Sequence, residues 1–178
     1  MSPAPSAAPV VETERLRLRP HAPDDFEASL ALWSDPEVTR FIGGRPAAGE
    51  EVWARVLRYI GHWTALGYGF WAVEEKATGR FIGEAGFADF RRTISPSLSG
   101  MVEMGWALAP SVHGKGYATE AVQGALAWGD AVFDVPVCCI ISPGNGPSVR
   151  VAEKAGFREL THTTYHDEPT VIYRRDPV

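Results

Sequence analysis

A glycine-rich segment, PSVHGKGYATEA at residues 110–121, leads directly into a stretch with helical spacing of apolar residues. The first N–H groups of a helix have no partner within it, and the helix dipole adds partial positive charge there. Glycine leaves such donors uncovered, so a phosphate or diphosphate group fits this position. The segment therefore predicts an anion-binding loop, in which Lys115 adds charge and Thr119 adds a hydroxyl.

Two common phosphate loops fit this segment poorly. A Walker loop requires GxxxxGK followed by Ser or Thr, whereas Gly116 follows Lys115 here. A dinucleotide-binding GxGxxG loop requires glycine or alanine where this chain has Thr119, and the motif comes late in the chain. An ordinary glycine turn that caps a helix remains the structural alternative.

A carboxylate lies on a predicted strand whose two faces differ. Period-two alternation over residues 101–109 separates bulky apolar side chains from small or acidic ones. The bulky apolar set is Val102, Met104, Trp106 and Leu108. The small or acidic set is Glu103, Gly105 and Ala107. We expect the small residues to leave room for a ligand beside Glu103, which favours this carboxylate as a general base. The alternatives are a structural ion pair with an arginine and, as a less favoured base, Glu84.

Strands and helices alternate along the rest of the chain. One strand is predicted at 12–20, and further strands begin at Phe70, Arg80 and Val135. Helices are predicted at 23–33, 52–66, 118–132 and 147–154, and two short strands end the chain. The strand–helix–strand unit over 101–141 requires a parallel strand pair. The pattern predicts an α/β (α+β) fold with a mixed, mostly antiparallel sheet flanked by about four helices.

Composition indicates one globular domain. The chain has 178 residues, 45% of them hydrophobic, and a net charge of −5, which suits a single core. We expect residues 1–11, rich in Pro, Ala and Ser, to form a flexible tail and residues 12–178 to form the domain. The acidic balance gives no electrostatic basis for nucleic-acid binding. No apolar run approaches the about 20 residues that cross a bilayer, and no Cys/His cluster has metal-ligand spacing.

The only two cysteines are adjacent, at Cys138 and Cys139 in the apolar run VPVCCII. Neighbouring cysteines rarely bridge each other, so this pair predicts buried thiols in a reducing compartment. The N-terminus lacks a basic region followed by a long apolar stretch and is not typical of a signal peptide. We therefore expect a cytoplasmic protein.

The chain contains, in this order, the segments ETERLRLRP, FIGEAGF, EMGWALAP, PSVHGKGYATEA and NGPSVRVAEKAGF. Together they resemble the GNAT superfamily of acetyltransferases, in its ribosomal-protein N-acetyltransferase (RimJ/RimL-like) branch. The resemblance extends from about Glu12 to Arg174. The glycine-rich segment resembles the acyl-CoA loop of that superfamily. The last segment resembles its second cofactor motif.

The resemblance implies a fold in which the central parallel strand pair splays at an acetyl-CoA site. The pantetheine arm would lie between the two strands, and a backbone N–H near Leu108 would bind the developing oxyanion. The asparagine amide would contact the pantetheine arm, although Asn145 between glycines is also typical of a turn. The implied cofactor contacts are Trp106, Ala107, Leu108, His113, Gly114, Lys115, Gly116, Tyr117, Ala118, Thr119, Asn145 and Ser148.

Two positions depart from the superfamily pattern. Ser111 stands where the loop of the superfamily usually opens with arginine or glutamine. Ala152 stands where related enzymes often have a tyrosine that acts as the general acid. Ser148 is therefore our first candidate for the acid that protonates the leaving thiolate, with Tyr117 and Tyr165 as rivals.

The resemblance implies transfer of an acetyl group from acetyl-CoA to a primary amine, by direct attack within a ternary complex. The acceptor is either a protein N-terminal α-amine or a small-molecule amine, and the acidic surface favours basic acceptors. The alternative is a catalytically impaired acyl-CoA-binding sensor or regulatory protein. A monomer or homodimer is expected, with no metal, nucleic-acid or membrane partner.

Overall fold

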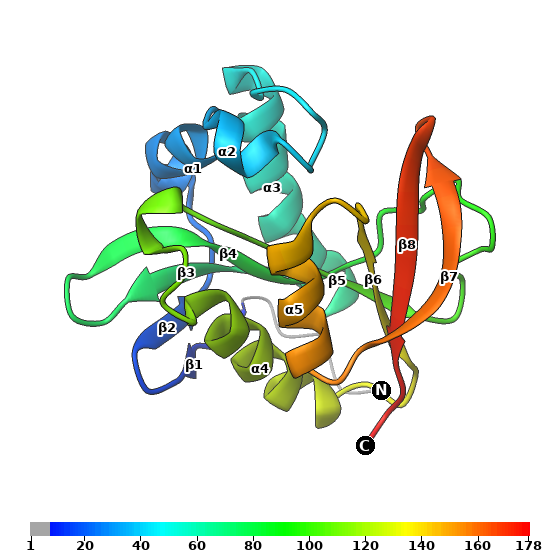
Figure 1. Cartoon of the computed structure of the whole chain (residues 1–178). Helices are drawn as coiled ribbons and strands as arrows, with labels where there is room; N and C mark the ends of the chain where they lie inside the picture. Colours follow the sequence, from blue (N-terminus) through cyan, green and yellow to red (C-terminus); the bar gives the residue numbers. More distant parts are fainter. Residues whose placement is uncertain (1–7) are drawn as a thin grey trace.

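The computed structural model describes residues 8–178 as one eight-stranded sheet with helices on both faces (Figure 1). The strands are β1 (Val11–Glu12), β2 (Leu16–Arg19), β3 (Phe70–Glu75), β4 (Arg80–Ala88), β5 (Val102–Leu108), β6 (Val137–Ile141), β7 (Arg158–Tyr165) and β8 (Glu168–Arg175). The helices are α1 (Phe26–Trp33), α2 (Pro36–Thr39), α3 (Gly49–Leu66), α4 (Tyr117–Asp130) and α5 (Gly146–Lys154), with single 3-10 turns at Pro23–Asp25 and Pro110–Val112.

The sheet has the order β1-β2-β3-β4-β5-β6-β8-β7. Its neighbouring strands are antiparallel except β5 and β6. The expected mixed, mostly antiparallel fold is confirmed. The described residues form five helices instead of about four, because the four-residue α2 is separate from α1.

The N-terminal segment differs from expectation. The single strand expected at 12–20 is a β1–β2 hairpin, closed where the N–H of Thr13 donates to the carbonyl of Leu16 at 3.0 Å. Residues 8–11, expected in the tail, pack on the domain: Ala8 is buried, and Trp71 Nε1 donates to the carbonyl of Pro9 at 2.7 Å. The tail expectation is therefore wrong for residues 8–11, while residues 1–7 lie outside the described part.

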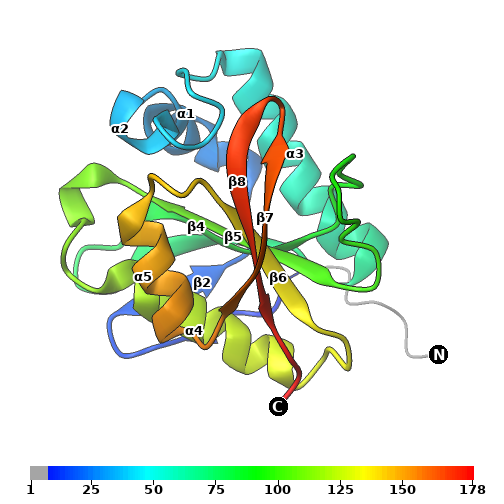
Figure 2. The ribbon, with the colours of Figure 1, turned by 45° about the vertical axis from the view of Figure 1, so that its right-hand side comes forward.

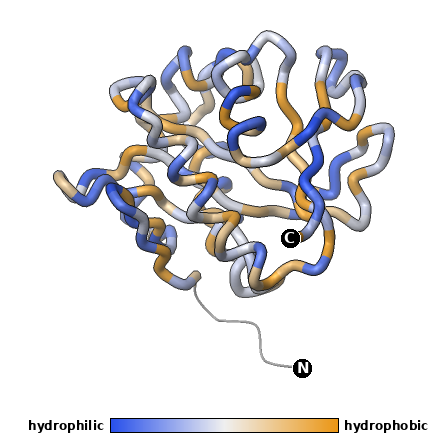
Figure 3. The backbone as a smooth tube through the Cα atoms, turned by 60° about the horizontal axis from the view of Figure 1, so that its bottom comes forward, coloured by the Kyte–Doolittle hydropathy of each residue, from blue (hydrophilic) through white to orange (hydrophobic). Residues whose placement is uncertain are grey.

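The two faces of the sheet carry different helices, as the views in Figures 1 and 2 show. α4 and α5 cover one face, and α1 and α3 cover the other. The small-residue stripe of α4 allows a close approach, since a Cβ on Gly129 would lie 2.9 Å from the Phe87 ring. In Figure 3, hydrophobic and hydrophilic stretches alternate along the chain, as expected for elements that bury one face each.

The predicted faces of β5 are confirmed. Val102, Met104 and Leu108 belong to the large core cluster with the α4 residues. Ala107 belongs instead to a second cluster with Leu32, Trp33, Val38 and Val52. The alternation of a strand therefore separates the two cores, and Glu103 lies on the α1–α3 side.

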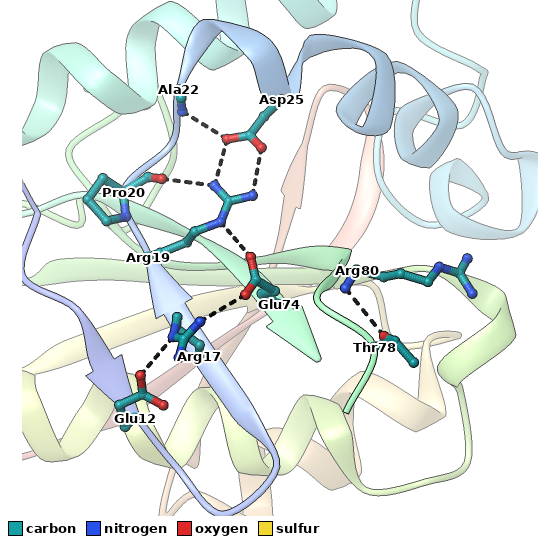
Figure 4. Close-up of polar contacts among 9 residues, drawn as sticks. All are labelled: Glu12, Arg17, Arg19, Pro20, Ala22, Asp25, Glu74, Thr78 and Arg80. Carbon is teal, nitrogen blue, oxygen red and sulfur yellow. Dashed lines mark hydrogen bonds and ion pairs between the residues drawn. The ribbon is translucent and has the colours of Figure 1, made fainter. Parts of the chain in front are cut away.

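Charged side chains tie the first edge of the sheet to the start of α1 (Figure 4). Arg19 donates to both carboxylate oxygens of Asp25, at 2.8 and 2.9 Å, and to Glu74 at 3.0 Å. Although burial opposes it, the hydrogen bonds from Arg19 and the N–H of Ala22 lower the pKa of Asp25. Arg17 extends this network between Glu74 and the neighbouring strand β1. The network orients α1, which carries Trp33 toward the sheet.

The parallel pair β5–β6 is joined only at its beginning. Val102 pairs with Val137 and Glu103 pairs with Cys138, and the register ends there. β6 nevertheless pairs with β8 along its whole length, through Ile141. The two strands therefore diverge toward their carboxyl ends, as the resemblance implied.

Candidate active site

Backbone groups of β5 point into the space where β6 has diverged. The N–H of Ala109 donates to the carbonyl of Ile82 at 2.8 Å. The backbone N–H and C=O groups of odd-numbered β5 residues therefore face β4, and those of even-numbered residues face the β6 side. Val102 N–H indeed donates to Pro136 on the β6 side at 3.0 Å. Trp106 and Leu108 share this direction but have no β6 partner. We call this region, from Met104 to Leu108, the open end of β5.

His113 lies beside the open end. Its Nε2 lies 2.8 Å from the carbonyl oxygen of Leu108, which leaves the Leu108 N–H as the group that faces the divergence. The imidazole therefore joins the glycine loop to the strand. That contact gives His113 a structural role, and its predicted cofactor contact stays a prediction.

The glycine loop leads into α4 as the sequence predicted. Gly114 and Gly116 have φ of 74° and 79°, in the left-handed region that L side chains rarely adopt. Gly116 is the N-cap residue, and the first intrahelical bond runs from the N–H of Glu120 to its carbonyl at 3.1 Å. The N–H groups of Tyr117, Ala118 and Thr119 thus precede the helical ladder and are free to bind an anion.

Arg15 anchors this loop from the β1–β2 hairpin. Its Nε donates to Glu120 at 2.6 Å, and its Nη1 donates to the carbonyl of Lys115 at 2.9 Å. Thr13 and the N–H of Arg15 also donate to Glu120, and these bonds lower the pKa of Glu120 against the effect of burial. The sequence carries no local signal for this role of Thr13 and Arg15, because only folding brings the hairpin to a loop about 100 positions later.

The Tyr117 side chain takes part in the same anchor. The Arg15 guanidinium lies 4.4 Å from the centre of its ring, and its hydroxyl donates to Glu75 at 2.6 Å. This hydrogen bond raises the pKa of Tyr117. The hydroxyl is engaged with the β3–β4 hairpin, so the geometry gives no support to Tyr117 as the acid.

Asn145 and Ser148 come together at the start of α5, which follows the carboxyl end of β6. Asn145 Oδ1 accepts the N–H of Ser148 at 3.3 Å, so this side chain caps the helix. The Asn145 side chain therefore has a local structural role as a helix cap, and its predicted contact with the pantetheine arm stays a prediction. Ala152, one turn beyond Ser148, is fully buried in the large core cluster.

Glu103 lies at the paired end of β5, and its carboxylate is bound by Arg92. Three N–H···O contacts join them, at 2.7, 2.7 and 2.9 Å. The guanidinium also donates to Tyr165 at 3.2 Å and lies 4.8 Å from the Phe90 ring centre. Glu103 is thus the ion-paired strand carboxylate that the sequence left open as an alternative, and its role as a base stays an untested prediction.

The room expected beside Glu103 is absent. A Cβ on Gly105 would lie 3.0 Å from Cζ of Phe70, so the Phe70 ring fills that side of the glycine. Ala107 is buried against Trp33 and Val52. The expectation of open space is therefore wrong, because aromatic residues of β3 and α1 occupy the volume that the small residues leave.

Glu84 on β4 is the second carboxylate on this face and is 1% exposed. Tyr59 OH and Trp33 Nε1 both donate to its Oε1, at 2.7 and 3.1 Å. Its Oε2 is buried without a hydrogen-bond partner among the described residues. Burial raises the pKa of Glu84 to about 7, although the Arg55 charge and the two hydrogen bonds act in the opposite direction.

The cysteines are buried thiols, as predicted. Burial raises the pKa of Cys138 to about 12 and that of Cys139 well above its ordinary value. Neither is a thiolate near neutral pH, which agrees with transfer that uses no acyl-cysteine. Within residues 8–178 there is no group of three or more His, Cys, Asp or Glu side chains arranged to hold a metal ion. Over the same range, no helix is both long and apolar enough to span a bilayer.

The sequence pattern of the family described as acetyltransferase (GNAT) domain matches residues 15–158, which is more than half of the chain. The chain belongs to the GNAT acetyltransferase family. A relative described as uncharacterized protein YkkB of Bacillus subtilis is 31% identical over 172 residues, covering 92% of this chain and 93% of that protein. The family expected from the sequence is confirmed, and the expected enzyme class, an acyltransferase, is confirmed with it.

Solved GNAT structures agree with this assignment. A putative GnaT-family acetyltransferase from Bordetella pertussis is 30% identical, with a TM-score of 0.83 over 94% of this chain and 99% of that one. RimL, a ribosomal L7/L12 alpha-N-protein acetyltransferase in complex with coenzyme A, is 16% identical, with a TM-score of 0.77 over 94% and 98%. The similarity to RimL shows the fold, and ribosomal-protein acetyltransferases are among the structural neighbours of this chain.

Proposed function

We propose that this GNAT protein transfers an acetyl group from acetyl-CoA to a primary amine, by direct attack of the amine on the thioester. The observation that carries the proposal is the open end of β5 beside a glycine loop whose N–H groups precede α4. A thioester is already reactive, so alignment of two substrates supplies most of the catalysis that is needed, up to ~7–11 kcal/mol in favourable cases.

The loop residues fit a diphosphate. A Cβ on Gly114 would meet no atom within 4 Å, so the glycines serve conformation and access instead of packing. The proposed anion contacts are the backbone of His113, Gly114, Lys115, Gly116, Tyr117, Ala118 and Thr119. Lys115 is exposed and adds positive charge to the loop.

The pantetheine arm and the reacting carbonyl are assigned to the open end. Trp106, Ala107 and Leu108 supply the strand that borders it, and the N–H of Leu108 is the proposed oxyanion donor. We assign Nδ2 of Asn145 to the pantetheine arm from the β6 side, and the Ser148 hydroxyl to the leaving thiolate. Ser148 lies in the first turn of α5, whose partial positive charge also favours a thiolate.

The acceptor class is a primary amine, either a protein N-terminus or a small molecule. α1, α3 and the 91–100 segment border the face away from α4, which we assign to the acceptor. Phe41 reaches across to the β6–α5 loop, since a Cβ on Gly144 would lie 3.3 Å from its ring. We also propose a cytoplasmic location, from the two reduced thiols, and a monomer or homodimer.

A second candidate is a sensor that binds acyl-CoA without turnover. The buried Ala152 favours it, because that position offers no hydroxyl where related enzymes often have an acid tyrosine. The two functions differ in one measurement, which is thiol release from acetyl-CoA in the presence of an acceptor.

The test combines calorimetry with thiol release. We expect coenzyme A to bind, and acetyl-CoA to release thiol with at least one member of a panel of N-terminal peptides, polyamines and aminoglycosides. Binding without turnover on the whole panel would support the sensor. Absence of coenzyme A binding would contradict both functions.

A further inference from the structure

The two oxygens of the Glu84 carboxyl group have different surroundings. Oε1 accepts two hydrogen bonds, from Tyr59 on α3 and Trp33 on α1. Oε2 is as deeply buried but has no partner among the described residues. A buried polar atom without a partner costs about 1–3 kcal/mol, and more when it carries charge. Strain, a bound water or ion, and a catalytic role are the explanations for such an atom, and the position of Glu84 in the sheet decides among them.

Glu84 lies at the reacting end of the sheet, unlike Glu103. It pairs across the strands with Ala107, the residue before Leu108, whose N–H faces the divergence of β5 and β6. Glu103 precedes Ala107 by four residues, which corresponds to about 13 Å along a strand. Of Glu84 and Glu103, Glu84 is the one that adjoins the proposed oxyanion donor.

The groups around Glu84 come from four elements. α3 contributes Tyr59 and the guanidinium groups of Arg55 and Arg58, and α1 contributes Trp33. The flanking strand partners, Ala72 on β3 and Ala107 on β5, carry no charge. Arg55 donates to the Tyr59 hydroxyl at 3.1 Å, which in turn donates to Glu84. Burial opposes the carboxylate form, which is stabilised by the Arg55 and Arg58 charges and by the two hydrogen bonds to Oε1.

We propose that Glu84 is the general base of the reaction and that its Oε2, which is covered in the free protein, takes a proton from the acceptor ammonium group once acceptor binding has moved the side chains that cover it. The inference rests on the proposed function. The ammonium proton passes to Oε2, which leaves a neutral amine and a neutral carboxyl group. The amine lone pair then forms the C–N bond, the C–S bond breaks with its electron pair going to sulfur, and the second amine proton ends on the thiolate.

Burial suits Glu84 to this task. Because its pKa is raised to about 7, the carboxyl group exchanges a proton near neutral pH with an amine of similar basicity. A protein α-amino group, with a pKa near ~8, lies within this range, whereas a lysine side chain near ~10.4 lies outside it. The base therefore favours acceptors of lowered basicity.

The decisive variant is Glu84→Gln, which keeps the shape and the hydrogen-bond acceptor at Oε1. We expect kcat to fall by about 10²–10⁴-fold while coenzyme A binding by calorimetry stays unchanged. Glu74→Gln on the adjacent strand β3 is the matched control, since Glu74 only pairs with Arg17 and Arg19. A folded Glu84→Gln protein that binds coenzyme A and keeps kcat within threefold of wild type overturns the proposal.

The pH profile separates a base from a structural residue. For wild type we expect kcat to rise with pH around 7, at a midpoint that does not move between two acceptors whose amines differ in pKa. Tyr59→Phe removes a hydrogen bond that favours the carboxylate, so this midpoint should move to higher pH. An unmoved midpoint in Tyr59→Phe overturns the proposal even if Glu84→Gln fails to fold.

The outcome for wild type distinguishes this inference from the proposed function. If wild type and Glu84→Gln acetylate an amine equally well, the proposed function is supported and only the assignment of Glu84 as the base is overturned. A wild-type chain that acetylates no amine contradicts both.

Discussion

The two ends of β5 use the same residue type in opposite ways. At the paired end, Glu103 is bound by Arg92 through three short contacts, and the strand is paired with β6. Beside the open end, Glu84 on the neighbouring strand β4 has no ion pair among the described residues, one oxygen without a partner and a raised pKa. The comparison teaches that a buried carboxylate has a structural role where a guanidinium binds both of its oxygens. It is a candidate for catalysis where one oxygen has no partner.

The largest expected effect is on stability at the paired end. Arg92→Ala leaves the buried Glu103 without its counter-charge, which should cost about 3–5 kcal/mol in the free energy of unfolding. Urea unfolding measures this loss. In the double variant Arg92→Leu/Glu103→Leu most of the stability should return, because no unpaired charge remains. If Arg92→Ala keeps its stability but loses kcat, the paired end is catalytic and the comparison is reversed.

A second effect, on the pH dependence of stability, belongs to the open end. The pKa of Glu84 rises from its ordinary value near 4.5 to about 7 on folding, so between these values the folded state binds more protons than the unfolded state. Stability should therefore fall as pH rises, by about 3 kcal/mol between pH 4 and pH 8 from this group alone.

The matched measurement uses the difference between wild type and Glu84→Gln. Because glutamine does not titrate, the variant should gain about 3 kcal/mol relative to wild type across the same pH interval. Urea unfolding at several pH values gives the difference. A constant difference at every pH would show that Glu84 does not titrate in this window.

A third, smaller effect separates backbone strain from cofactor binding. Gly114→Ala and Gly79→Ala place alanine at similar positive φ, 74° and 68°, and neither Cβ meets an atom within 4 Å. Each should lose about 1–2 kcal/mol of stability. Only Gly114→Ala should also weaken coenzyme A binding, by about tenfold in calorimetry. Equal affinities in the two variants would remove the glycine loop from the cofactor site.

The smallest effect is expected at Ser148. Removal of its hydroxyl in Ser148→Ala should lower kcat by about tenfold, because a thiolate leaves without much assistance from an acid. Its backbone N–H still donates to Asn145, so the helix cap and coenzyme A affinity should persist. Thiol-release kinetics measure the change. An unaltered kcat would leave water as the proton donor.

Much of the site was readable from sequence because its chemistry is local. The glycine loop and the helix that follows it depend on residues within a few positions of one another, as Gly116 illustrates. Local spacing also predicted the faces of β5, since alternation is a property of a single strand. The volume beside Gly105 could not be predicted, because Phe70 comes from a different strand.

By itself, the sequence determined the family, the order of elements, the loop before α4 and the burial of Cys138 and Cys139. Only the tertiary structure decided which carboxylate is paired, because Arg92, Tyr59 and Trp33 come from other elements, 11, 25 and 51 positions from the carboxylates that they contact. The physical reason is that charge and hydrogen-bond partners act through space, and the balance between burial and pairing exists only after the chain has folded.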